Sequence, residues 1–196
     1  MQILPIFMTA CIVVGTLAAH AARAGSVVVG VNAWYRPPGM SQEEFIKQLA
    51  DNGVKTIRIG LLPSWVDLIV QAYRHGIGTL LIVGPQMGSD AKARTSWSDV
   101  PLSECNPRGF TAAFRPVLDQ LEAAGVRLTG IELGNEPNYP RFNGDLPNPG
   151  SGRVLGLADL NNPKDPEGPA IAAGFRTYIQ VAAALKDIRD HSKLNQ

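Results

Sequence analysis

The sequence predicts an α/β fold in which short parallel strands alternate with amphipathic helices. Short apolar runs recur along the chain, and segments with apolar residues at helical spacing separate them. Continuous apolar runs of this length are typical of strands that are buried on both faces of a parallel sheet. Such an alternation leaves two architectures, an open doubly wound sheet and a closed (β/α)8 barrel of the TIM type.

The alternation continues through four strands and four helices. Ser41 and Glu44 form a capping box at the start of the first helix, and Asn52-Gly53 marks its end. Two long polar connections, 84–106 and 137–168, are of a length that is usually functional. The expected strands are 27–32, 55–62, 78–83 and 127–133, and the expected helices are 41–52, 64–75, 110–124 and 169–190.

The most specific pattern is an apolar strand that runs into Asn135-Glu136-Pro137. In a barrel, catalytic residues lie at the C-terminal ends of the strands, so the position of this corner favours the barrel over the open sheet. Pro137 predicts an extended Glu136 and ends the strand there. Glu132 has the same parity as Glu136, so in a regular strand both would face the same side. The alternative is a strand followed by an ordinary Asn-Pro turn.

The segment 133–138, LGNEPN, resembles the fourth-strand motif of the clan A glycoside hydrolases, which are retaining enzymes on a (β/α)8 barrel. Families 5, 39 and 79 carry close variants. The resemblance implies that Glu136 is the general acid/base and that Asn135 hydrogen-bonds the sugar 2-hydroxyl. In this clan a carboxylate on strand seven is the nucleophile, and the four predicted βα units do not reach it.

We therefore expect residues 25–196 to be the N-terminal half of a glycoside hydrolase barrel domain, with an unknown nucleophile and no activity on its own. The alternative is a non-catalytic carbohydrate-binding or interaction protein derived from a truncated barrel. A carbohydrate is the expected partner in both cases. The sequence leaves the oligomeric state open, and a dimer that closes a barrel would favour an independent protein.

Arg58 interrupts an apolar strand, where a guanidinium needs a carboxylate partner, and Glu132 is available for that ion pair. The segment 57–60, IRIG, also resembles the clan A second strand, which would place Arg58 in support of the nucleophile. Trp34 and Tyr139 follow strands and are candidate platforms for a sugar ring, whereas Trp65 is expected in the core.

Residues 1–24 read as a cleaved signal peptide, with an apolar run at 3–19, no acidic residue, and Ala22-Arg23-Ala24 at the end. We expect a secreted or periplasmic protein after cleavage near Ala24. An uncleaved membrane anchor is the alternative, because Met1-Gln2 supplies no side-chain cation.

Cleavage leaves 17 basic and 17 acidic residues without a basic stripe, which argues against nucleic-acid binding and against a stable membrane association. Neither a metal nor a cofactor is expected, because the positions of His75, His191 and Cys105 in the sequence do not have the spacing of a metal-binding motif.

Overall fold

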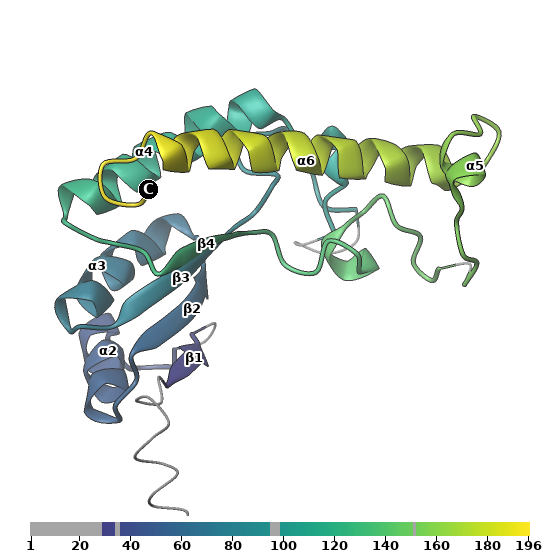
Figure 1. The fold of residues 1–196 in the computed structure, drawn as a ribbon. Coiled ribbons are helices and arrows are strands. Elements are labelled where there is room, and N and C mark those ends of the chain that lie inside the picture. Colours follow the sequence, from purple (N-terminus) through teal and green to yellow (C-terminus); the bar gives the residue numbers. More distant parts are fainter. Residues whose placement is uncertain (1–28, 34–35, 95–98, 151) are drawn as a thin grey trace, which may run out of the picture.

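A computed structural model describes residues 29–33, 36–94, 99–150 and 152–196. Within them, four parallel strands form one sheet in the order β1-β2-β3-β4 (Figure 1). The strands are β1 (Gly30–Asn32), β2 (Thr56–Gly60), β3 (Gly78–Val83) and β4 (Gly130–Leu133). The predicted alternation of parallel strands and helices is confirmed. The predicted signal peptide and Trp34 lie outside the described residues.

Helices connect successive strands, and a long helix follows the last strand (Figure 1). Neighbouring helices are in contact, namely α2 with α3, α3 with α4, and α4 with α6. Helix α6 also packs against η2. Of the helices in the described residues, none is both long and apolar enough to cross a membrane. The helices are α2 (Gln42–Asp51), α3 (Val66–Arg74), α4 (Pro107–Ala123), α5 (Leu157–Leu160) and α6 (Gly168–Asp190), with 3₁₀ turns η1 (Pro63–Trp65), η2 (Leu102–Glu104) and η3 (Pro140–Phe142).

Local signals set the helix ends. The Ser41 hydroxyl accepts a hydrogen bond from the Glu44 N–H at 3.1 Å, and the Glu44 carboxylate accepts one from the Ser41 N–H at 2.8 Å, which confirms the capping box. Helix α4 begins earlier than the apolar spacing predicted, because Asn106 Oδ1 accepts from the N–H groups of Arg108 and Gly109. Pro107 then occupies the first turn, where its missing N–H costs nothing.

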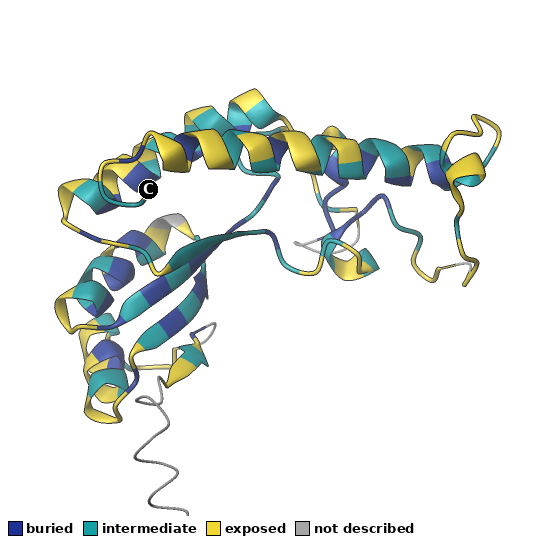
Figure 2. Cartoon of the chain, viewed as in Figure 1, coloured by how far each residue is buried: buried dark blue, intermediate teal, exposed yellow. Residues whose placement is uncertain are grey.

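The two faces of the sheet differ. The residues of one face, Ile57, Ile59, Leu81 and Val83, belong to the hydrophobic core, which also contains apolar residues of α2, α3, α4 and α6. Successive residues point to opposite faces, and burial alternates along β2 and the first part of β3 (Figure 2). The residues of the other face are outside this core cluster; they include Arg58, Leu80, Ile82 and Glu132.

The segment after α6 returns to the sheet and is held there by Glu122 at the end of α4. Its carboxylate accepts hydrogen bonds from Ser192 Oγ, from Leu194 N–H at 3.0 Å and from Asn195 Nδ2 at 3.0 Å. Asn195 Oδ1 in turn accepts from the Leu128 N–H at 2.7 Å, just before β4. Burial alone would raise the pKa of Glu122, but these hydrogen bonds lower it to about 2.

Candidate active site at the ends of β2 and β4

Strand β4 ends at Leu133, and the chain then bends into the Asn-Glu-Pro corner. Gly134 has φ +70°, and its N–H donates to the Val83 carbonyl at 2.8 Å. Glu136 has φ +43°, the only positive φ among the non-glycine residues that the structure describes. The prediction of an extended Glu136 was therefore wrong, and the parity argument that linked it to Glu132 fails because the strand is not regular beyond Leu133.

A turn follows directly from Glu136. The Glu136 carbonyl accepts a hydrogen bond from the Tyr139 N–H at 2.9 Å, which closes a turn over Pro137 and Asn138. The Asn143 Nδ2 donates to the Pro137 carbonyl at 3.0 Å and fastens the turn from outside. A left-handed backbone at a residue with a side chain costs on the order of 1–3 kcal/mol, so the contacts around it must hold it in place.

Glu136 is exposed, and within the described part of the chain the interaction of its carboxylate is the attraction to Arg58. A carboxyl group at this place, beside the C-terminal ends of parallel strands, can reach a bound molecule. The side chain of Glu136 is thus exposed just beyond the end of β4, and its role as a catalytic acid stays a prediction.

Arg58 joins β2 to β4 through a forked set of hydrogen bonds. Its Nε donates to Glu132 Oε2 at 2.8 Å, and its Nη2 donates to Glu132 Oε1 at 2.5 Å and to Asn135 Oδ1 at 2.9 Å. The side chains of Arg58 and Glu132 are 25% and 35% exposed. Glu132 is therefore the carboxylate partner that the sequence predicted for Arg58, and Asn135 is a further acceptor.

The charges at this site reinforce one another. The hydrogen bonds to Glu132 raise the pKa of the Arg58 guanidinium against the opposing effect of burial, and attraction to Glu132 and Glu136 adds to the rise. Arg58 therefore stays a cation. Because Asn135 Oδ1 faces this cation, the Nδ2 of Asn135 is left as a donor for another group.

Tyr178 on α6 supports the end of β4, a contact that was not predicted from the sequence. Its hydroxyl donates to the Leu133 carbonyl at 2.7 Å. Burial raises the pKa of Tyr178, and the negative charge of Glu132 adds to this effect. The one signal in the sequence was a tyrosine within the apolar stripe of the last helix, where a buried hydroxyl requires a partner.

Two aromatic rings follow the corner. Tyr139 is 52% exposed, and its ring centroid lies 6.2 Å from that of Phe142 with 55° between the planes. Tyr139 is thus accessible to a ligand, as expected of a stacking platform. Trp65 is half-buried against the hydrophobic core, which confirms its predicted place.

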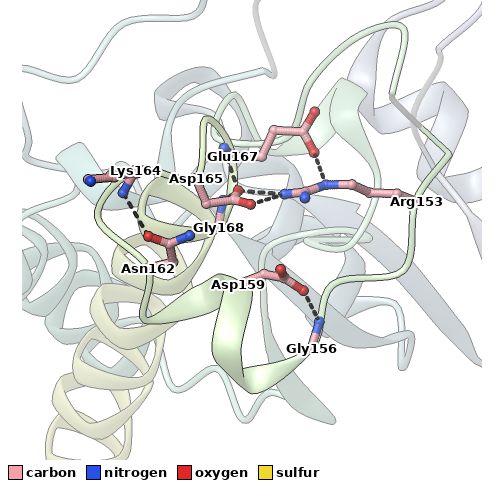
Figure 3. A network of polar contacts seen from close by, with 8 residues as sticks. All are labelled: Arg153, Gly156, Asp159, Asn162, Lys164, Asp165, Glu167 and Gly168. Carbon is pink, nitrogen blue, oxygen red and sulfur yellow. Dashed lines mark hydrogen bonds and ion pairs between the residues drawn. The ribbon is translucent and has the colours of Figure 1, made fainter.

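The long loop between β4 and α6 is anchored at two points. In the first, shown in Figure 3, Arg153 contacts Asp165 and Glu167, and Asp165 Oδ1 accepts the Gly168 N–H at 2.7 Å where α6 begins. The ion pair with Arg153, together with this N–H, lowers the pKa of Asp165. Within the described ranges no three His, Cys, Asp or Glu side chains form a group that could hold a metal ion.

In the second anchor, the buried Asp145 accepts hydrogen bonds from Ser103 N–H at 2.8 Å and Ser103 Oγ at 2.5 Å. Gly174 of α6 packs on this carboxylate so closely that a Cβ there would lie 2.1 Å from Asp145 Oδ2. Nearby, burial first and the charges of Asp145 and Glu104 second raise the pKa of the Cys105 thiol to about 12. Cys105 is therefore no nucleophile at neutral pH.

Comparisons with known proteins assign no family to this chain. A scan against protein-family models finds no match, and a search of the curated proteins finds none. What the site can do therefore follows from the geometry of its own residues.

Proposed function

We propose that the chain is the N-terminal half of a (β/α)8 glycoside hydrolase domain of the clan A type, exported after signal cleavage. The unreversed order of four parallel strands supports the barrel. Crossovers in parallel sheets are right-handed, so an order without reversal puts every helix on one face. A doubly wound sheet reverses its order and carries helices on both faces. Here the core contains side chains from a single face of the sheet.

The observation that carries the proposal is the exposed carboxylate of Glu136, held at the end of β4 in a left-handed backbone beside Arg58. Glu136 would protonate the glycosidic oxygen and then activate water. A positioned proton donor of this kind typically contributes about 10²- to 10⁴-fold in rate. The strained corner supports this role because strain of this kind clusters at active sites.

Asn135 and Tyr139 would bind the sugar. Because Arg58 fixes the Asn135 side-chain oxygen, the amide nitrogen is oriented as a donor to a hydroxyl oxygen of the sugar. The exposed ring of Tyr139 offers an apolar face for stacking. A role for Trp34 in the same platform stays a prediction.

A retaining mechanism needs a second carboxylate about 5–5.5 Å from the first. Glu132 is the one acidic residue in the four described strands, and Arg58 engages both of its oxygens. Glu132 is therefore a support for Arg58 and not a nucleophile. This observation also favours the second candidate function, a carbohydrate-binding protein without turnover.

The test is to measure hydrolysis and binding with one panel of aryl glycosides and polysaccharides. The purified chain should bind a member of the panel and hydrolyse none. Asn135→Ala should weaken binding about tenfold, the equivalent of one hydrogen bond of about 1.4 kcal/mol. Glu43→Gln, at an exposed acid of α2, is the control for Glu136→Gln.

Hydrolysis that Glu136→Gln abolishes and Glu43→Gln spares would keep the acid/base role and overturn the inactivity. Binding that is absent from the whole panel, or unchanged in Asn135→Ala, would overturn the proposed carbohydrate site.

A further inference from the structure

Residues 136–143 form a closed unit beyond the end of β4, and Asn143 closes it. The Tyr139 N–H donates to the Glu136 carbonyl at 2.9 Å, which makes the first turn of the unit. The Asn143 side chain then reaches back along the chain, and its Nδ2 donates to the Pro137 carbonyl at 3.0 Å. The unit therefore carries both Glu136 and Tyr139, and both of these residues are exposed.

The amide group of Asn143 is fully buried, and its two partners set its orientation. Its Nδ2 faces the Pro137 carbonyl, and its Oδ1 accepts the Asp145 N–H at 3.0 Å. A flipped amide would place a donor against an N–H and an acceptor against a carbonyl. Because a buried polar group without a partner is costly, losing either contact would displace the unit.

Asp145 ties this amide to the connection between β3 and α4. Its carboxylate accepts hydrogen bonds from Ser103 N–H at 2.8 Å and from Ser103 Oγ at 2.5 Å, and the Gly144 N–H donates to the Val100 carbonyl at 3.1 Å. A Cβ on Gly144 would lie 2.3 Å from the carbonyl oxygen of Asp99, so the two segments pack backbone against backbone. The end of the unit is therefore fixed to this connection.

We propose that Asn143 is a positioning residue, which holds the backbones of Glu136 and Tyr139 in place by linking their turn to the β3–α4 connection. The contacts run from the Pro137 carbonyl through the Asn143 amide to Asp145. Without such contacts, the residue before a proline favours extended backbone. The left-handed Glu136 persists because the surrounding structure holds it there.

The consequence for sugar binding rests on the proposed function. An acid and a stacking ring that engage one sugar must keep a fixed spacing, and here their backbones belong to one closed unit. Loss of the contact between Asn143 and Pro137 would let Glu136 and Tyr139 move apart. Glycan binding should then weaken about tenfold, the equivalent of one hydrogen bond of about 1.4 kcal/mol.

The first experiment follows Glu136 by nuclear magnetic resonance in the full chain. A residue with positive φ has its amide and α protons close together, so the wild type should show a strong cross-peak between them. Asn143→Asp keeps the acceptor for the Asp145 N–H and removes the donor to Pro137. This variant should lose the strong Glu136 cross-peak at neutral pH.

Two controls separate this effect from the change of residue type and from general destabilisation. Asn161→Asp also removes a side-chain donor to a backbone carbonyl, that of Leu157 at 2.8 Å in the same loop. Leu118→Ala truncates a fully buried side chain of α4 and leaves the unit untouched. Both controls should keep the Glu136 cross-peak.

Acid should rescue Asn143→Asp. The introduced carboxyl group would occupy a fully buried site, and burial raises the pKa of a carboxyl group. Once protonated, its O–H can donate to the Pro137 carbonyl as the amide does. The Glu136 cross-peak should therefore return as the pH is lowered, with the wild type at each pH as the reference.

A second variant tests the far end of the link. Ser103→Ala removes the hydroxyl bond to Asp145 and keeps the backbone one, so it should weaken the Glu136 cross-peak less than Asn143→Asp does. Its matched control is Ser89→Ala, which removes a serine hydroxyl bond to a backbone carbonyl elsewhere in the same connection.

An unchanged Glu136 cross-peak in folded Asn143→Asp would overturn the proposal, and so would a loss that acid does not reverse. If Asn143→Asp does not fold by circular dichroism, Ser103→Ala decides, and a cross-peak as strong in that variant as in Ser89→Ala would overturn the link. Absent glycan binding in the wild type would refute the proposed function alone, because the cross-peak reports the backbone of Glu136 without any ligand.

Discussion

The paired hydrogen bonds from Arg58 to the two oxygens of Glu132 give a quantitative test of the site. Arg58→Met removes the three hydrogen bonds to Glu132 and Asn135 and leaves the Glu132 carboxylate without its partner. Breaking a fully buried pair costs about 3–5 kcal/mol, and breaking an exposed one costs about 0–1 kcal/mol. With side chains 25% and 35% exposed, the pair lies between these limits. We therefore expect Arg58→Met to destabilise the protein by about 2 kcal/mol.

Urea unfolding followed by circular dichroism measures this loss. With a denaturant slope of about 2 kcal/mol per molar urea, the midpoint should fall by about 1 M. The control is Lys47→Met, which breaks the pair of Lys47 with Asp51, whose side chains are 64% and 60% exposed. That substitution should cost less than about 0.5 kcal/mol.

A double-mutant cycle with Glu132→Gln separates the pair from the loss of each side chain alone. The coupling between Arg58→Met and Glu132→Gln should be about 1–2 kcal/mol. Two results would show that the Arg58–Glu132 pair does not hold β2 to β4: a cycle without coupling, or a loss of unfolding free energy in Arg58→Met no larger than in Lys47→Met.

Two further predictions concern contacts away from the site. Glu122→Gln should cost about 1–2 kcal/mol at neutral pH because charged hydrogen bonds are lost. Folding lowers the pKa of Glu122 from its ordinary value of 4.5 to about 2, so its contribution to stability is present above pH 4.5 and is lost as the pH falls toward 2. The urea midpoints of the variant and the wild type should therefore converge in acid, and a constant gap would contradict the assignment. Gly174→Ala should lower the midpoint of thermal unfolding, because the added Cβ would lie 2.1 Å from the Asp145 carboxylate. Overpacking of this kind typically costs about 1–3 kcal/mol. A higher midpoint, as helix propensity alone predicts, would show that Asp145 can move.

Most of the fold could be predicted from the sequence because its signals are local. Apolar runs placed the four strands, and the capping box of Ser41 and Glu44 placed the start of α2. The boundaries deviate where a local signal was overlooked. Asn106 caps α4 ahead of its first apolar residue, and the first residues of the helix expected at 64–75 instead belong to the 3₁₀ turn η1.

The candidate site could be predicted only in part, because its geometry depends on long-range contacts. The pairing of Arg58 with Glu132 followed from the cost of burying a lone charge, and the structure confirms it. The contact of Tyr178 with Leu133 links residues 45 positions apart, so the apolar stripe around Tyr178 indicates that its hydroxyl needs a partner but not which one. The bend at Gly134 likewise depends on the neighbouring strand, since its N–H donates to Val83.

Glu136 shows why such contacts matter for function. The sequence rule before a proline describes a local clash, and it predicted an extended residue. The structure instead has a left-handed Glu136, in a turn closed by Tyr139 and fastened by Asn143, while Arg58 fixes the neighbouring Asn135. These ties come from segments before and after the corner, so the strained backbone persists only in the folded chain. The corner therefore fixes the backbone of Glu136 relative to Arg58, whereas a bound substrate would have to fix its exposed carboxylate, as proton transfer requires.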